Sequence, residues 1–233
     1  MSNPFLAPST LPYQLPPFAE IRDEHYAPAI EQGMAEQLAE ISAITRRRDM
    51  PTFENTMVPL ESSGQLLTRV LRVFYNQCSA NSTDATNALE AELAPKLAAH
   101  TDAIRLDSAL YWRIAQLHDQ RETLDLTPEQ RYLVERHYTE MTLAGAGLDE
   151  VQKARLSELN ARISTLETTF EKNLLADTND LAVVIDDPAE LDGLTPGELS
   201  AAAQAAADRG LEGTHLVTLV LPTGHPWLEN LTN

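Results

Sequence analysis

The sequence predicts a mainly α-helical protein, an antiparallel bundle of helices and helical hairpins with a small two-stranded β element near the C-terminus. From residue 25 onward, apolar residues recur at steps of three and four, which is the period of one helical face. Near residue 180 this pattern gives way to short β-branched runs, which are typical of strands. We therefore expect an extended proline-rich arm (residues 1–22), a helical body (23–179) and a β-α-β appendage (180–233).

The N-terminal arm contains many prolines, which disfavour regular elements because proline has no backbone N–H to donate. They are Pro4, Pro8, Pro12, Pro16 and Pro17. The arm lacks the cationic and apolar regions of a secretory signal, and no stretch of the sequence reaches the roughly 18 apolar residues of a membrane span. A single cysteine, Cys78, excludes an internal disulfide and fits a reducing compartment. These features predict a cytoplasmic protein that does not bind membranes.

The first helix is predicted over residues 25–47, with one apolar face. That face contains Tyr26, Ile30, Met34, Leu38, Ile41 and Ile44. Arg46, Arg47 and Arg48 follow, and Pro51 comes just beyond them. Cations in a last turn complement the helix dipole, and a net charge of −18 repels phosphate backbones. We interpret these arginines as a helix end and expect no nucleic-acid partner.

Further helices are predicted over residues 57–79, 84–104 and 108–120. In the first of these, the inward residues are expected to be Leu60, Leu67, Val70, Leu71 and Phe74.

Two later helices have strong start signals. Thr127-Pro128-Glu129-Gln130 combines a capping threonine, a proline at the first helical position and a glutamine that reaches back to the cap. This helix should end at Gly145 or Gly147. Asp149 with Gln152 starts the longest helix, which we expect to form an antiparallel hairpin with the preceding one. Its regular apolar stripe is Leu156, Leu159, Ile163, Leu166, Phe170 and Leu174.

The appendage is predicted to contain strands at Leu181–Ile185 and His215–Pro222, with their pairing direction left open. Between them, Thr195 and Glu198 form a capping box that opens an alanine-rich helix ending before Gly210. The sequence then closes with apolar residues, Trp227, Leu228 and Leu231, which either fold back or pack against sequence beyond residue 233. In the second case, apolar surface should be exposed around Trp227 and along helix faces.

No catalytic, cofactor-binding or metal-binding residue is predicted in this chain. The histidines are His25, His100, His118, His137, His215 and His225, and no pair has the spacing of H-E-x-x-H. We interpret the E-x-x-H string Glu212–His215 as a coincidence in a loop, and "DEHY" (Asp23–Tyr26) as a helix cap. His137 and Glu140 are expected to form a surface pair. Cys78 is expected to be a buried, inert thiol. "GAG" (145–147) reads as the end of a helix, because no phosphate-binding loop surrounds it.

Several segments together resemble one known family. They are "TLPYQLPPFAEIRDEHYAPAIEQGMAEQLAEI" (10–41), "PTFENTMVPLESSGQLLTRV" (51–70), "SANSTDATNALEAELAPKLAAHTDAI" (79–104) and "LSELNARISTLETTFEKNLLADTN" (156–179). In this order they resemble the opening part of the thimet-oligopeptidase family of zinc peptidases, and most of all its bacterial peptidyl-dipeptidase branch, with oligopeptidase A and neurolysin as relatives. "PTFENT" and the helix around "LNARISTLETTFEKNLL" are the most specific parts.

The resemblance implies a neurolysin-like N-terminal region that forms one wall of a deep channel for short peptides. In that family the zinc ligands, H-E-x-x-H and a downstream glutamate, lie in the C-terminal half, so no ligand can be assigned here. The implied partners are the C-terminal catalytic domain of the same polypeptide and short peptide substrates, which lose C-terminal dipeptides. The implied cofactor is zinc in the full-length parent, with none in this chain, and the isolated chain is expected to be inactive.

A second hypothesis is a free-standing acidic helical protein that acts in interaction or regulation and has no enzymatic activity. Its acidic surface and the lack of a recognisable site fit this hypothesis equally well. A stop codon after Asn233 would favour it, whereas a reading frame that continues to an H-E-x-x-H helix would favour the peptidase.

Overall fold

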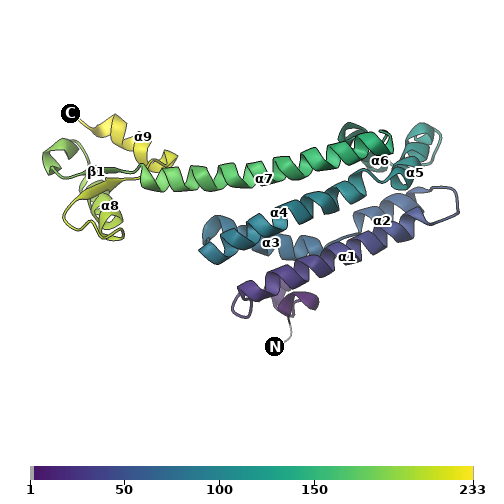
Figure 1. Cartoon of the computed structure of the whole chain (residues 1–233), viewed down its shortest axis with the longest axis horizontal. Helices are drawn as coiled ribbons and strands as arrows, with labels where there is room; N and C mark the ends of the chain where they lie inside the picture. Colours follow the sequence, from purple (N-terminus) through teal and green to yellow (C-terminus); the bar gives the residue numbers. More distant parts are fainter. Residues whose placement is uncertain (1–2, 233) are drawn as a thin grey trace. The chain divides into compact units, whose positions relative to one another are not determined.

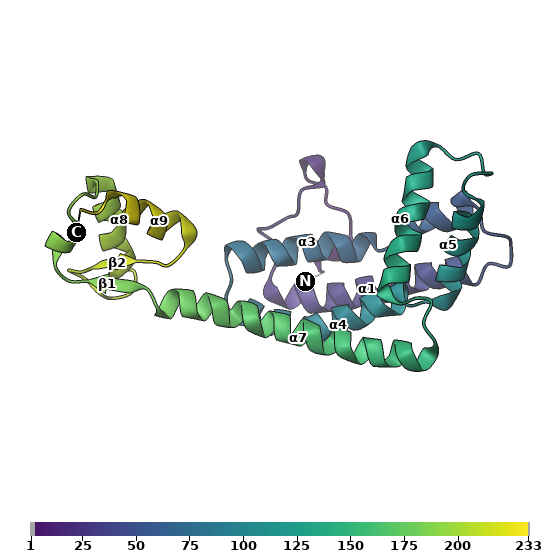
Figure 2. The same cartoon turned by 90° about the horizontal axis from the view of Figure 1, so that it is seen from above.

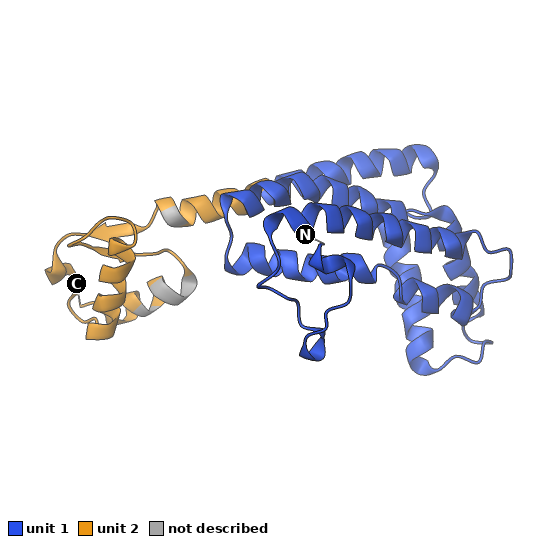
Figure 3. Ribbon diagram, turned by 90° about the horizontal axis from the view of Figure 1, so that it is seen from below, with its two compact units in different colours: residues 1–168 blue, residues 169–233 orange. Residues whose placement is uncertain are grey.

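The computed structural model describes residues 3–232, apart from the side chains of Asn179, Leu221, Pro222, Thr223 and Pro226. The chain divides into two compact units, residues 1–168 and 169–233 (Figure 3). The boundary falls within one long helix, α7 (Glu150–Asp180). None of the helices in the described part has the length and hydropathy that crossing a membrane requires.

The first unit is helical, as predicted (Figure 1). Short 3₁₀ turns at Pro4–Leu6, Pro12–Gln14 and Asp23–His25 precede α1. The remaining elements of this unit, before α7, are α1 (Tyr26–Thr45), a π-helical turn (Phe53–Met57), α2 (Val58–Glu61), α3 (Gln65–Ala80), α4 (Asp84–Arg105), α5 (Ser108–Gln120) and α6 (Pro128–Ala144). The predicted starts at Thr127 and Asp149 are confirmed: Gln130 N donates to Thr127 Oγ1 and Gln152 N to Asp149 Oδ1. Gly145 ends α6 in the left-handed region at φ 100°, also as predicted.

One core of this unit lies where α1, α3 and α4 run side by side (Figure 1). The ring of Tyr26 contacts those of Phe5 and Phe74, with centroids 5.4 and 5.1 Å apart. A Cβ atom on Gly33 of α1 would lie only 2.8 Å from Leu67 Cα of α3, so glycine allows these two helices to approach closely. Phe5 is 2 % exposed, and this contact anchors the N-terminal segment on the bundle.

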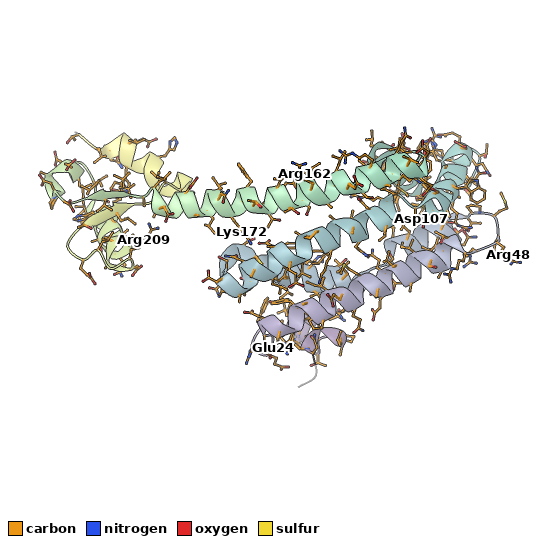
Figure 4. All side chains as sticks on the ribbon, in the orientation of Figure 1. Glu24, Arg48, Asp107, Arg162, Lys172 and Arg209 are labelled. Carbon is orange, nitrogen blue, oxygen red and sulfur yellow. The ribbon has the colours of Figure 1, made fainter. Side chains whose placement is uncertain are left out.

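A second core is formed mainly by α5 and α6, which pack against each other, together with the end of α1. Its buried members are Ile41, Ile44, Met57, Leu110, Ile114, Leu117, Val134, Met141 and Ala146. Asp107, labelled in Figure 4, caps α5 because its Oδ1 accepts hydrogen bonds from Ala109 N and Leu110 N at 2.8 and 2.7 Å.

The helix predicted over residues 57–79 is broken into α2 and α3, so that prediction was wrong in its continuity. Gly64 separates them with φ 69°, a left-handed conformation that glycine adopts without a Cβ clash. Its N–H donates to Glu40 Oε2 at 2.8 Å, and the Gln37 side chain occupies the space beside its Cα. The break therefore depends on α1, which lies far away in the sequence.

The predicted hairpin of α6 with α7 was also wrong. Figure 2 shows α6 beside α5 and running across the direction of α7. Most of the stripe on α7 that was expected to pack inward is exposed, with Leu159 at 40 %, Ile163 at 50 % and Leu166 at 57 %, whereas Leu156 at its start is half-buried. Leu38, expected on the inner face of α1, is likewise 38 % exposed.

The second unit contains the predicted two-stranded sheet. β1 (Val183–Ile185) pairs antiparallel with β2 (His215–Val217), with Val183 opposite Val217. β2 ends before the predicted Pro222, because the chain enters α9 (Leu221–Asn230) instead. A 3₁₀ turn (Pro188–Leu191) and α8 (Pro196–Ala207) complete the unit, and Glu198 N donates to Thr195 Oγ1 as the capping box requires.

Trp227 folds back onto its own unit. It is 5 % exposed and packs with Leu191, Leu194, Ala202 and Val217. Thr232 N donates to Asp192 O at 3.0 Å and closes the chain over this core. The expectation of exposed surface around Trp227 was therefore wrong, although Leu228 is 78 % exposed.

Arg113 of α5 is the largest buried polar side chain of the first unit, with 1 % of its surface exposed. Its guanidinium donates to Asn55 Oδ1 at 2.7 Å and to Thr56 Oγ1 at 3.2 Å. It also donates to the backbone carbonyls of Arg47 at 3.3 Å and Asp49 at 3.1 Å. These bonds join α5 to the end of α1 and to the "PTFENT" turn.

Replacing Arg113 with methionine should lower the free energy of unfolding by about 3 kcal/mol. Methionine keeps much of the buried volume, but it leaves the oxygens of Asn55 and Thr56 and two carbonyls without their donor. Urea unfolding of the isolated chain measures this. The exposed pair of Arg136 with Glu140 gives the control, because R136M should change stability by less than about 1 kcal/mol. Equal midpoints for R113M and the unchanged protein would contradict the role of Arg113.

Stability should also fall as the pH drops below about 6.5, the ordinary value for histidine. Burial lowers the pKa of His100, which is 8 % exposed. Its Nε2 lies 2.7 Å from Gln37 Oε1, and its buried Nδ1 has no partner. The unfolded chain therefore binds the proton more readily, and the contribution of neutral His100, complete above that pH, is lost as the pH falls through the lowered pKa.

Urea unfolding between pH 7.5 and 5 checks this prediction. H100N should flatten the dependence of the midpoint on pH, whereas H225N, at an exposed position of α9, should leave it unchanged. An unchanged slope in H100N would assign the effect to other groups.

Candidate functional site

Two hollows in the surface of the first unit lie between α1 and the α2–α3 segment, and one of them reaches Asn55 of the "PTFENT" turn. One has a volume of about 310 Å³ and is lined by Glu40, Ala43, Ile44, Arg47, Asn55, Pro59 and Ser62. The other has a volume of about 340 Å³ and is lined by Leu6, Gly33, Glu36, Glu40, Ser62, Gly64, Gln65, Leu66 and Arg69. Because they share Glu40 and Ser62, we treat them as one candidate site, the α1–α3 hollow.

Asn55 positions the wall of this hollow through its own turn. Its Oδ1 accepts from Thr52 N at 2.8 Å, and its Nδ2 donates to Met50 O at 2.9 Å. The same Oδ1 accepts from Thr56 Oγ1 and from Arg113. The "PTFENT" sequence therefore builds a rigid polar turn, and the conformation of Asn55 is set from both sides.

The charged groups of the hollow are largely engaged within the protein. Glu40 accepts from Gly64 N, and Arg69 Nη2 donates to Phe5 O at 2.6 Å. Arg47 pairs with Asp49 at 2.8 Å, and this hydrogen bond lowers the pKa of Asp49. These bonds hold the side chains of Glu40, Arg69 and Arg47 in the walls of the hollow.

The hollow has no nucleophile paired with a base. Ser62 Oγ donates to Val58 O at 2.8 Å, and no histidine is among the described lining residues. A serine without a base is a poor nucleophile. Its described lining suits noncovalent contacts.

The histidines are used in separate local roles. His25 Nδ1 accepts from Arg22 N at 3.0 Å, which makes "DEHY" part of the helix start, as expected. His118 stacks on Tyr138 with ring centroids 3.9 Å apart. His215 begins β2, directly after the turn that contains Glu212, and His225 is exposed on α9.

The surface pair expected between His137 and Glu140 does not form. His137 Nε2 lies 2.6 Å from Glu61 Oε1, whereas Glu140 accepts from Arg136 Nε at 2.7 Å. Glu61 lies in α2, 76 positions from His137, so no local pattern in the sequence predicts this contact. The bond from Arg136 lowers the pKa of Glu140.

Cys78 is half-buried against the core of α1, α3 and α4. Burial raises its pKa to about 11, and Glu90 adds to this effect. The thiol is therefore protonated at neutral pH and a poor nucleophile, in line with the expected inert role.

The donor side chains of the described residues are not grouped to hold a zinc ion. Within residues 3–232 no group of three or more His, Cys, Asp or Glu side chains is placed to hold a metal ion. The prediction of no catalytic, cofactor-binding or metal residue stays a prediction, because activity and metal content are measurable only in solution.

Arg113 and the α1–α3 hollow were missed from the sequence. Arg113 lies on the apolar face of α5 with Leu110, Ile114 and Leu117, which was a readable signal of a buried cation. The hollow had no such signal, because residues 40–47 and 55–69 are brought together only by packing.

Comparison with known proteins gives consistent relatives. The dipeptidyl carboxypeptidases of Escherichia coli and Salmonella typhimurium are 39 % and 40 % identical over 98 % and 99 % of this chain, which covers 34 % of each relative. Oligopeptidase A of Haemophilus influenzae is 31 % identical over 97 % of this chain, which covers 32 % of that protein. No protein-family profile matches.

The chain thus spans about a third of the length of the curated relatives that it matches. The matches cover both units, from the N-terminal segment to α9, so they are not confined to one motif. Over nearly its whole length, the chain is therefore similar to the N-terminal part of the thimet-oligopeptidase-like family of peptidases.

Proposed function

We propose that this chain is the channel-wall domain of a zinc-dependent oligopeptidase that releases C-terminal dipeptides from short peptides. One observation carries the proposal: the relatives named dipeptidyl carboxypeptidase are 39 % and 40 % identical to nearly the whole chain, yet they are about three times as long. In this proposal the chemistry resides in the part of such a polypeptide that the chain does not match.

The described residues support a positioning role. One wall of the α1–α3 hollow, at Asn55, is held by Arg113, and the described lining residues include no nucleophile–base pair. In the parent, a zinc site of the H-E-x-x-H type outside this chain would polarise the scissile carbonyl and activate water. Residues of this chain would shape the channel and exclude folded proteins.

The net charge of −18 gives this wall a further property. A strongly acidic surface repels acidic polypeptides and attracts cationic groups, including the free amino terminus of a peptide. Short peptides with basic residues should therefore approach the wall faster than acidic ones, and added salt should reduce the difference.

The isolated chain should neither hydrolyse peptides nor retain stoichiometric zinc. An N-blocked tripeptide and pentapeptide, analysed for released dipeptide by mass spectrometry, test hydrolysis, and elemental analysis after dialysis tests zinc. The Escherichia coli dipeptidyl carboxypeptidase is the positive control. Chelator-sensitive release of dipeptide by the isolated chain would contradict the proposal, because it would place the catalytic groups within residues 1–233.

The gene gives an independent test. A reading frame that continues past Asn233 into a segment with H-E-x-x-H supports the peptidase, whereas a stop codon at that point contradicts it.

A further inference from the structure

The part of α7 within the first unit has two distinct faces, and the polar one contacts the bundle. Asn160 Nδ2 donates to Asp102 Oδ1 of α4 at 2.8 Å, and Lys153 Nζ bonds to Ser108 Oγ at the start of α5. Lys153 is 6 % exposed, so this cation is buried by the contact. The bundle is thus attached to α7 through hydrogen bonds and a lysine, not through the apolar stripe.

The apolar face of α7 points elsewhere. Leu159, Ile163 and Leu166 are 40 %, 50 % and 57 % exposed. At about 100° per residue, these side chains lie on one face, roughly a third of a turn away from Lys153 and Asn160.

Such a face is unusual for a surface that remains in water. A row of leucine and isoleucine side chains at steps of three and four is the pattern by which helices pack against one another. Because α7 presents polar residues to its own bundle, the apolar row is not needed by the core of the first unit. A partner with a matching apolar helix face explains the pattern.

We propose that the α7 stripe, defined as Leu159, Ile163 and Leu166, is the docking surface for a helix of the same polypeptide beyond the matched third. This rests on the proposed function, since it takes the parent to be as long as the relatives. About two thirds of each dipeptidyl carboxypeptidase lies outside the match, which is ample chain to supply that helix.

Charge favours this occupant over a second copy of the chain. Two copies would bring together molecules that each carry a formal charge of −18, and this repulsion opposes self-association. Arg155 and Arg162, seven positions apart in the sequence, follow one edge of the stripe, and Figure 4 labels Arg162 on α7. A helix with acidic residues beside its apolar face would complement that edge.

The first test uses the isolated chain. Replacing Leu159, Ile163 and Leu166 together with glutamine should leave the urea midpoint unchanged and should reduce the fluorescence of bound 8-anilinonaphthalene sulfonate. Loss of cooperative unfolding in this variant would overturn the proposal, because it would show that the stripe already serves the chain's own core. The matched control is L110Q, at a core position that is 1 % exposed, which should unfold the protein.

The second test measures protection of the stripe in a longer polypeptide. Ile163→Cys in a Cys78→Ser background is labelled with a maleimide, in the isolated chain and after the chain replaces its counterpart in the Escherichia coli relative. Labelling should slow by about tenfold or more in the longer protein. Glu158→Cys, on a third face of α7 and exposed, should label at similar rates in both.

Equal labelling rates of Ile163→Cys in both proteins would overturn the proposal that the stripe is a docking surface for the rest of the polypeptide. Slow labelling already in the isolated chain, together with a dimer in sedimentation velocity, would also overturn it and would identify a second copy as the occupant. If the fused protein does not fold, the position of the Escherichia coli relative aligned with Ile163 carries the same measurement. Peptidase activity of the longer protein is measured separately. Activity together with an accessible stripe would contradict only the docking surface, whereas a protected stripe without activity would contradict only the proposed function.

Discussion

The buried guanidinium of Arg113 is the constraint on which the first unit depends. A cation in a protein interior is costly unless every donor finds an acceptor, and here no carboxylate is among its hydrogen-bond partners. Its acceptors are instead a side-chain amide, a hydroxyl and two backbone carbonyls, all from residues 47–56. An irregular segment with few apolar residues is thereby held against α5 in one conformation. The same network sets the wall of the α1–α3 hollow at Arg47 and Asn55.

The local signals in the sequence predicted most helix starts correctly, because a cap is made by residues within one turn of each other. Thr127 with Gln130, Asp149 with Gln152 and Thr195 with Glu198 all form the expected bonds. The two strands were also readable, since β-branched runs bounded by turn residues need no distant partner to be recognised.

The errors share a different cause, which is packing between distant segments. The break at Gly64 requires Glu40 and Gln37 of α1, and the bond of His137 requires Glu61 of α2. The stripe on α7 was recognised as one face, but periodicity does not tell which neighbour that face will meet. The hollow was invisible for the same reason, and Arg113 was overlooked because charged residues are usually assumed to lie on the surface.

The orientation of α7 connects these findings. Within a single domain, a helix normally turns its apolar face to the core, because burial of apolar area is the main favourable term in folding. Here the cores around Phe74 and Ile114 are complete without α7, and the helix is attached by Asn160 and Lys153. A helix whose apolar face is not buried in its own unit can bury that face against another part of a larger protein. The same division is seen in the comparisons, in which the chain matches a third of proteins whose remaining length would build the rest of the fold.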